Sequence, residues 1–238
     1  MQVGTVERIW RYPVKSMLGE RLPAAEVEPR GLVGDRRYAV RDADGRLGSG
    51  KSNSRFRKFA ALLASTARYG PDGVVVLTLP DGRTVRADED RVHQELSAAL
   101  GRDGVRLAAE AEAEVSHFDA SPVHLVTTAS LGWLADAVPA VTVDERRLRP
   151  NLLIRTGQRA GTVEDAWVGR PLRVGDRVRL RVTDRTERCV MANAAQPGLE
   201  HRGEILKAVA DGNDLTLGIY AEVLAGGTVR LGDPVVLD

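Results

Sequence analysis

The sequence predicts an α+β protein dominated by β-barrel structure, with two β-rich units and a few helices. Three observations support this fold class. Short segments that alternate apolar and polar residues recur along the chain, separated by tight turns rich in Gly, Pro and Asp. Helical periodicity is confined to four segments. The strands do not alternate regularly with helices, as a doubly wound parallel sheet would require.

The first unit is expected to span residues 1–115 as an N-terminal β-barrel-like domain. Its clearest strands alternate apolar and polar side chains or carry β-branched runs that stop at a turn. These strands are expected at residues 3–10, 38–41 and 74–79.

Two helices are expected in the same unit. Residues 56–66 show helical periodicity, and residues 90–100 form an amphipathic stretch. In the second stretch Asp90 is expected to cap the N-terminus, and Gly101 follows the last turn.

The second unit is expected to span residues 116–238, with a boundary near residues 110–120. Its strands are expected at residues 123–127, 152–155, 178–182, 217–223 and 228–231. Its helices are expected at residues 130–138 and 203–210.

Charge and hydropathy exclude several classes of partner. Lys plus Arg number 34 and Asp plus Glu number 33, giving a net charge of +1 and no strong field for nucleic acid or anionic lipid. No segment reaches the roughly 18 apolar residues of a membrane span. Residues 1–7 lack the basic and apolar regions of a secretory signal. We therefore expect no nucleic-acid or membrane partner and a cytoplasmic location.

Cys189 is the only cysteine, so it cannot form an internal disulfide or, without clustered histidines, a zinc site. Three interpretations stay open: a buried inert thiol, a nucleophile or sulfur carrier, and the single thiolate ligand of a soft metal. The small residues at 192–198 would let a bulky cofactor approach the thiol, or would form a mobile loop.

A candidate anion site lies near the end of the first strand. The motif Tyr-Pro-Val-Lys-Ser at residues 12–16 places Lys15 beside Ser16, and the segment 31–37 adds Arg36. A compact ammonium, a hydroxyl donor and a guanidinium fork together suit a phosphate. The alternative is a strand end and a turn whose charges face solvent, since no Walker-type glycine loop is present.

A second candidate segment is Arg-Leu-Arg-Pro-Asn at residues 147–151. Pro150 biases Arg149 to an extended conformation, and Asn151 offers both a donor and an acceptor. Such a pair can recognise a heterocycle or a phosphate. It can equally be a turn with a surface arginine.

Six motifs occur in order along the chain: Tyr-Pro-Val-Lys-Ser, Gly-Leu-x-Gly-Asp-Arg, Arg-Pro-Asn, Glu-Asp-x-Trp-x-Gly at residues 164–169, Arg-Cys-Val, and Gly-Ile-Tyr-Ala followed by Gly-Asp at residues 232–233. In this set the chain resembles MOSC-domain proteins, the superfamily of the molybdenum cofactor sulfurase C-terminal domain, with the N-terminal β-barrel domain that often precedes it. It is similar to the amidoxime-reducing component family. The resemblance covers nearly the whole chain.

The resemblance implies a molybdenum cofactor site. Cys189 matches the family cysteine that ligates molybdenum, and thiolate is a suitable ligand for a soft metal. The positions that match the phosphate site or lie beside the cofactor are Lys15, Ser16, Arg36, Arg149 and Asn151, to which we add Arg188 next to the cysteine. The histidines His93, His117, His124 and His201 match no family function and are expected to be solvated or hydrogen-bonded.

The chain departs from the family pattern at two places near the cysteine. Glu187 stands two residues before Cys189, where relatives often have a small polar residue. A carboxylate there is expected to alter the electrostatics of the metal centre or to act as a catalytic proton donor. Residues 196–198 are Gln-Pro-Gly in place of the Asp-Pro-x-Thr-Gly found in some relatives.

The leading functional hypothesis is a molybdenum-dependent reductase of N-hydroxylated small molecules. The sequence ends at residue 238 with no cysteine-rich ferredoxin extension, so electrons are expected from a separate donor protein. One alternative is a sulfurtransferase that carries on Cys189 a persulfide received from a cysteine desulfurase. The other is a non-catalytic carrier of the cofactor.

Overall fold

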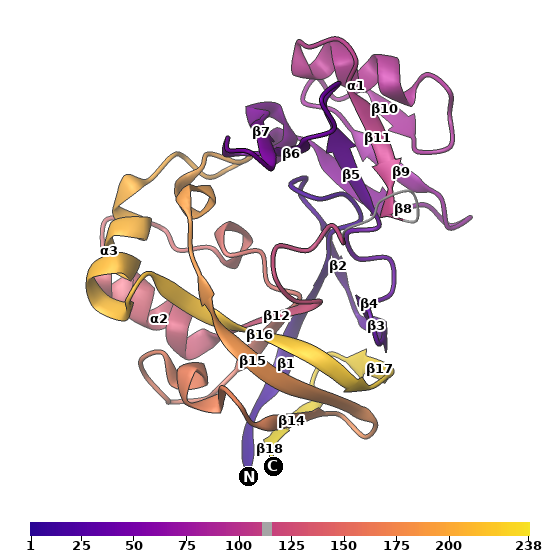
Figure 1. Cartoon of the computed structure of the whole chain (residues 1–238). Coiled ribbons are helices and arrows are strands. Elements are labelled where there is room, and N and C mark those ends of the chain that lie inside the picture. The colour runs from indigo at the N-terminus through magenta and orange to yellow at the C-terminus, as the bar shows by residue number, and fades with distance from the viewer. Residues whose placement is uncertain (111–115) are drawn as a thin grey trace.

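A closed ring of strands forms the larger part of the computed structural model, which describes residues 1–110 and 116–238 (Figure 1). Around the ring the order is β1-β13-β12-β16-β15-β14-β18, and β1 pairs with both β13 and β18 to close it. Neighbours run antiparallel except for β12 and β13. The barrel strands are β1 (Gln2–Arg11), β12 (Val123–Thr127), β13 (Leu152–Arg155), β14 (Pro171–Val174), β15 (Val178–Glu187), β16 (Thr216–Ala225) and β18 (Pro234–Leu237).

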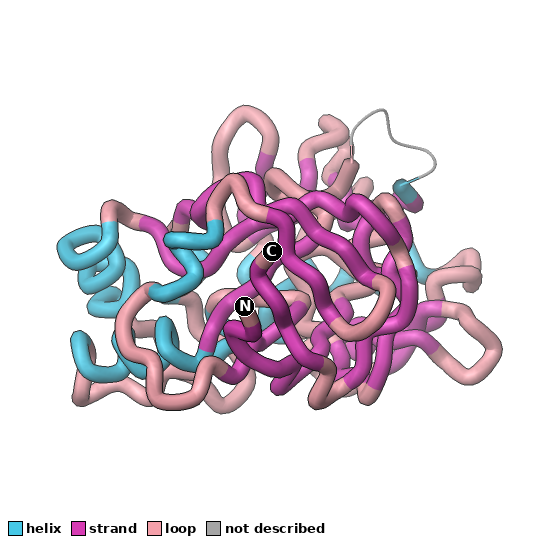
Figure 2. Tube along the Cα trace, turned by 90° about the horizontal axis from the view of Figure 1, so that it is seen from below, coloured by secondary structure: helices cyan, strands magenta, loops and turns pink. Residues whose placement is uncertain are grey.

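Strands β12 and β13 carry apolar residues side by side, at six of their nine positions, because both of their faces are buried. Leu125 and Ile154 belong to the cluster inside the barrel. Val126 and Leu153 belong to a second cluster shared with helices α2 (Thr128–Ala137) and α3 (Gly203–Asn213). The two helices lie together over one side of the barrel (Figures 1 and 2). A strand covered on both faces loses polar alternation, which explains these continuous apolar runs.

A smaller lobe is formed by the first half of the chain. One sheet has the order β11-β5-β6-β7, and another the order β10-β9-β8. Helix α1 (Val92–Leu100) packs against this lobe through Val92 and Leu96. The strands are β5 (Tyr38–Arg41), β6 (Leu47–Ser49), β7 (Phe56–Lys58), β8 (Thr66–Tyr69), β9 (Val75–Thr78), β10 (Thr84–Arg86) and β11 (Arg106–Ala109).

Short strands connect the lobe to the barrel. β2 (Glu20–Leu22) pairs with the far end of β1. A three-stranded sheet joins β3 (Ala24–Glu28) and β4 (Gly31–Leu32) with β17 (Gly227–Arg230). Single 3-10 turns complete the described elements: η1 (Ala60–Ala64), η3 (Glu145–Arg147), η4 (Val163–Trp167) and η5 (Val190–Asn193).

The expected division at residue 115 does not separate the sheets, because the first strand of the chain belongs to the barrel. β1 is hydrogen-bonded between β13 and β18, whose residues all come from the second predicted unit. Residues 111–115, on which the predicted boundary falls, lie outside the described residues. The two-domain division therefore stays a prediction, while the α+β barrel class is confirmed.

The helix predicted at residues 56–66 is wrong. Residues 56–58 form β7, which pairs in parallel with β6, and only the 3-10 turn η1 follows before β8 begins at Thr66. The apolar spacing that suggested a helix instead places Phe59 and Leu62 in the core of the lobe. Pairing with β6 outweighs the local helical preference, as tertiary contacts often do.

The other predicted elements are present, with two changes. Helix α1 is preceded by Arg91, which makes no side-chain capping bond, so the expected cap by Asp90 is wrong. Gly101 does adopt the left-handed conformation after the last turn, with φ 62°. Strand β15 extends five residues beyond the predicted end at residue 182, up to Glu187. That extension carries the chain to the cysteine.

Truncation of Ile219 will test the barrel core against the barrel surface. Ile219 on β16 is fully buried, and Ile219→Ala is expected to lower the free energy of unfolding by about 2–5 kcal/mol through lost burial and a cavity. Leu224 on the same strand is 48% exposed, so Leu224→Ala is expected to change the free energy of unfolding by less than about 0.5 kcal/mol. Urea unfolding at constant slope measures both, and equal effects would contradict the assigned core.

Candidate functional site

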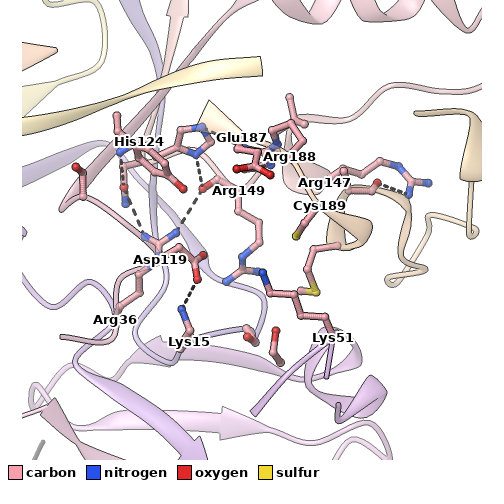
Figure 3. Close-up of a pocket in the computed structure, with 18 residues that line it drawn as sticks. Lys15, Arg36, Lys51, Asp119, His124, Arg147, Arg149, Glu187, Arg188 and Cys189 are labelled. Carbon is pink, nitrogen blue, oxygen red and sulfur yellow. Dashed lines mark hydrogen bonds and ion pairs between the residues drawn. The ribbon is translucent and has the colours of Figure 1, made fainter. Parts of the chain in front are cut away.

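A cleft of about 230 Å³ lies between the barrel and the smaller lobe, and every site residue predicted from the sequence lines it (Figure 3). They come from four separate segments of the chain. These residues are Lys15, Ser16, Arg36, Arg149, Asn151, Glu187, Arg188 and Cys189. Among the charged side chains that line the cleft, six are cationic and two are acidic. The cleft is therefore suited to an anion.

Three of these residues hold a backbone conformation that is unfavourable outside glycine. Ser16, Arg36 and Arg149 have φ values of 67°, 50° and 55°. The expected extended conformation of Arg149 is therefore wrong. Its left-handed turn directs the carbonyl to His124 and Arg36, which overrides the bias from Pro150. Such strain costs on the order of 1 kcal/mol or more per residue and is typical of functional sites.

Lys15 is a buried ammonium with a carboxylate partner. It is 4% exposed, and its Nζ donates to the His117 carbonyl at 2.9 Å and to Asp119 at 2.7 Å. Burial lowers the pKa of Lys15, and Asp119 opposes that shift. Burial alone would raise the pKa of Asp119, but Lys15 and the neighbouring cations outweigh it and hold that pKa well below its usual range. One of the three ammonium hydrogens is left for a ligand.

Arg36 and Arg149 share the ring of Tyr12. Their guanidinium carbons lie 4.8 and 4.3 Å from the ring centroid, within the range of cation–π attraction. Arg36 is also paired with the buried carboxylate of Asp35. Both terminal nitrogens of Arg149 are buried and lack a hydrogen-bond partner within residues 1–110 and 116–238. Burial lowers the pKa of Arg149 to about 10, so it remains cationic at neutral pH.

Ser16 and Asn151 are occupied mainly with main-chain groups. The Ser16 hydroxyl donates to the Gly48 carbonyl at 3.1 Å. The Asn151 amide donates to the Trp10 carbonyl at 3.3 Å and accepts from the His124 amide at 3.1 Å. Asn151 thereby ties β1 to β12 beside the cleft. Its predicted contact with a cofactor stays a prediction.

His124 connects the second candidate segment to the cysteine segment. Its Nδ1 lies 3.2 Å from the Arg149 carbonyl, and its Nε2 lies 3.4 Å from Nη1 of Arg188. Because the carbonyl can only accept and the guanidinium can only donate, the imidazole is neutral with its proton on Nδ1. Burial, with the charge of Arg188, holds the pKa of His124 well below its usual range.

Gly218 makes room for this imidazole. It has φ 82°, and a Cβ there would lie 2.7 Å from the Leu125 carbonyl and 2.9 Å from Nε2 of His124. Pairing between β15 and β16 is irregular here. From Val182 to Asp184 the chain of β15 advances two residues while β16 advances one. From Arg185 to Glu187, β15 again advances two residues, but β16 advances three. Gly218 lies in that longer step, as a β-bulge glycine does.

Cys189 lies two residues after the end of β15 and lines the cleft as a half-buried residue. The segment behind it is held by Arg147, which is 3% exposed. The Arg147 guanidinium donates to the carbonyls of Ala194 at 3.1 Å and Glu200 at 2.6 Å. A buried arginine bound to several carbonyls fixes the loop that presents the thiol.

The two residues that precede the cysteine differ in environment. Arg188 is 9% exposed, and its Nη2 donates to the Leu148 carbonyl at 2.8 Å, so it links the cysteine to the second candidate segment. Burial lowers the pKa of Arg188. Glu187 is exposed at the edge of the cleft. It has the solvent access that a proton donor needs.

Several lining residues carried no sequence signal strong enough to find them. His124 lies in the strand predicted at residues 123–127, but nothing local distinguished it from the other histidines. Lys51 and Asp119 line the cleft from segments with no recognised motif, and Tyr220 lies in the Gly-Ile-Tyr-Ala motif but was not assigned to the site. The rarity of lysine in this arginine-rich chain was the one available signal for Lys51.

Comparison with known proteins places the chain in a family. The MOSC domain model matches residues 96–236, and the MOSC N-terminal beta barrel domain model matches residues 3–122. The chain belongs to the MOSC-domain family, which is associated with binding of the molybdenum cofactor.

Individual relatives are distant. The chain is 26% identical to mitochondrial amidoxime reducing component 2 of Bos taurus, over 98% of this chain and 83% of the relative. It is 26% identical to mitochondrial amidoxime-reducing component 1 of Mus musculus, over 99% of this chain and 83% of that protein. Among solved structures, the YUAD protein from Bacillus subtilis superposes with a TM-score of 0.54 at 11% identity, covering 98% of this chain and 93% of the other. That likeness shows the fold.

The cleft fits the anionic cofactor that the family implies. The unpartnered nitrogens of Arg149 and the excess of cations suit a phosphate, and the thiol of Cys189 reaches the same space. The described residues contain no cluster of three His, Cys, Asp or Glu side chains arranged for a metal ion. Among the predicted site residues, Cys189 carries the thiol that would be available to a soft metal held by such a cofactor.

Loss of the Arg147 contacts is expected to free the thiol. Arg147→Met leaves the carbonyls of the loop without their donor, so alkylation of Cys189 by iodoacetamide should become at least about threefold faster. Arg170→Met, at an exposed site with one carbonyl contact, serves as the control and should leave the rate unchanged. An unchanged rate in the Arg147 variant would show that other contacts hold the loop.

Acid is expected to destabilise the fold through His117. Burial lowers the pKa of His117 to about 4, so the unfolded chain binds a proton on this ring at a higher pH than the folded chain does. Stability should therefore fall between about pH 6.5 and pH 4, by roughly 1–2 kcal/mol at pH 5. His117→Asn should reduce the difference between the urea midpoints at pH 7.5 and pH 5. The exposed His201→Asn should not, and identical pH profiles for all three proteins would refute the assignment.

Proposed function

We propose that the protein binds a molybdenum–pterin cofactor in the cationic cleft and reduces N-hydroxylated small molecules with electrons from a separate redox protein. The observation that carries the proposal is the convergence of motifs from four distant segments on one cleft that holds both unpaired cationic groups and the single thiol. The names of the relatives, amidoxime-reducing components, support reduction as the activity.

The cationic wall would hold the phosphate of the cofactor. Lys15 has one ammonium hydrogen left, and Arg149 has both terminal nitrogens without a partner in the described chain. Arg36 adds charge beside them, although Asp35 neutralises part of it. A phosphate monoester carries close to two negative charges at neutral pH, so the site binds it without burying an unpaired charge.

The bound cofactor would supply two-electron removal of oxygen from the substrate. The overall reaction takes an N–OH group, two electrons and two protons to an N–H group and water, so the N–O bond breaks and one N–H bond forms. Both electrons come from the donor protein. Glu187 is the exposed carboxylic acid at the edge of the cleft and would pass protons from solvent to the leaving hydroxyl.

The remaining side chains of the site orient these groups. Neutral His124 fixes the Arg149 carbonyl and the Arg188 guanidinium, and Arg147 fixes the loop after Cys189. Such positioning holds a thiolate ligand within the narrow geometry that a metal site requires.

No helix among the described residues is long and apolar enough to cross a membrane. The relatives are named as mitochondrial proteins. A cytoplasmic location for this chain and the identity of its electron donor stay proposals.

The direct test is the molybdenum and pterin content of protein produced in a host that makes the cofactor. We expect near-stoichiometric metal and pterin in the parent protein. Cys189→Ser should lose most of the metal and the amidoxime reduction, because one oxygen replaces the soft ligand at nearly constant volume. Arg149→Gln should lower pterin content about tenfold or more, the effect of losing a buried charged hydrogen bond. Arg170→Gln controls for the change in net charge.

Other outcomes identify the alternatives. Absence of metal and pterin, where a known relative loads, would contradict the proposal and direct attention to a persulfide on Cys189 supplied by a cysteine desulfurase. Full loading without reduction of any amidoxime would favour a cofactor carrier. Wild-type loading and activity in folded Cys189→Ser would show that the thiol serves only in packing.

A further inference from the structure

Most of the cationic side chains in the cleft already have hydrogen-bond acceptors in the protein. Four of the six lining cations have carboxylate or main-chain carbonyl acceptors: Lys15, Arg36, Arg147 and Arg188. The two others, Arg149 and Lys51, have no hydrogen-bonded or ion-paired partner for their side-chain nitrogens among the described residues. The phosphate site proposed above uses Arg149. Lys51 is left without a role.

Lys51 enters the cleft from a different wall. It lies on the loop between β6 and β7, whereas Arg149 comes from the segment that leads into β13. Figure 3 shows both side chains extending into the same cleft from these separate elements. The Lys51 ammonium lies 5.0 Å from the ring centroid of Phe56, which orients its flexible stem.

The loop that carries Lys51 touches the cysteine segment. A Cβ at Gly50 would lie 2.2 Å from the sulfur of Met191, so this glycine packs directly against a side chain two residues after Cys189. Lys51 therefore belongs to the part of the cleft next to the proposed metal ligand. A substrate has to reach that same part to react.

We propose that Lys51 is a specificity residue that binds a carboxylate on the substrate, so that the preferred substrates are N-hydroxylated compounds that also carry an anionic group. This inference rests on the proposed function. A half-buried ammonium on a flexible stem binds a carboxylate as a point charge and tolerates some variation in its position. The phosphate site proposed above uses Arg149 with Lys15 and Arg36, which come from other walls of the cleft, and does not include Lys51.

Calorimetric binding, which does not depend on turnover, tests the proposal on the protein as purified with its cofactor. The ligands are an aryl amidoxime and its meta- and para-carboxylates. We expect at least one carboxylate to bind about fivefold to tenfold more tightly than the neutral parent, a range typical of one partly exposed ion pair. Lys51→Met should abolish that preference and leave the affinity for the neutral amidoxime and the pterin content unchanged.

The matched control is Lys58→Met, which removes the same charge from the exposed end of β7, outside the cleft. It should retain the preference for the carboxylate. Equal affinity of Lys51→Met and the parent protein for the carboxylates, or no binding of either carboxylate, would overturn the inference. Loss of pterin in Lys51→Met would also overturn it, by assigning the ammonium to the cofactor. Failure of the proposed function appears separately, as absence of metal and pterin from the parent protein.

Discussion

Pairing of β1 with β13 on one side and β18 on the other closes the barrel, and the position of the cleft depends on it. β1 runs through the barrel wall and ends at Arg11, so the Lys15–Ser16 motif emerges where the second candidate segment enters β13. Asn151 bonds to the Trp10 carbonyl at this junction. A motif near residue 15 and one near residue 150 thus become neighbours through main-chain hydrogen bonds.

The site contains strained backbone and a buried charge without a partner, and burial of apolar residues in the barrel offsets their destabilising effect. Three residues with unfavourable φ values and a guanidinium without acceptors all lie on one cleft. Each of these features alone would destabilise a small domain by on the order of 1 kcal/mol or more. The doubly covered strands β12 and β13 supply burial that holds them in place. An anion bound in the cleft would relieve the charge but not the strain.

The sequence predicted the parts of the site whose chemistry is visible in single residues or short motifs. A lone cysteine, a lysine beside serine, and an Arg-Pro-Asn turn were recognisable, and all of them line the cleft. The roles of His124 and Lys51 depend on contacts across the chain, with Arg188 in one case and the Met191 segment in the other. No local pattern encodes such contacts. The order of the motifs along the chain supplied the family relation.

In the fold too, the elements set by local sequence patterns were predicted, and those set by pairing with distant strands were not. Strands with clear alternation or apolar runs were predicted to within a few residues, because periodicity is a local property. Residues 56–66 were assigned wrongly, because parallel pairing with β6 decided their structure. The barrel strands β14 and β18 were not predicted; both are four residues long and begin with a proline, which is a weak strand signal. Short strands depend on their neighbours for recognition.

The paired irregularities between β15 and β16 constrain how this part of the chain can change in length. Of the three irregularities in this pairing, the extra residue on β15 near Thr183 and the extra residue on β16 near Gly218 offset one another. Thr186 and Arg188 are therefore buried like Val182, although Asp184 between them is exposed. Deleting a residue from one strand alone would reverse inside and outside before the cysteine is reached. Length variation here is compatible with the site only when both strands change together, which makes this hairpin a coupled unit for insertion and deletion.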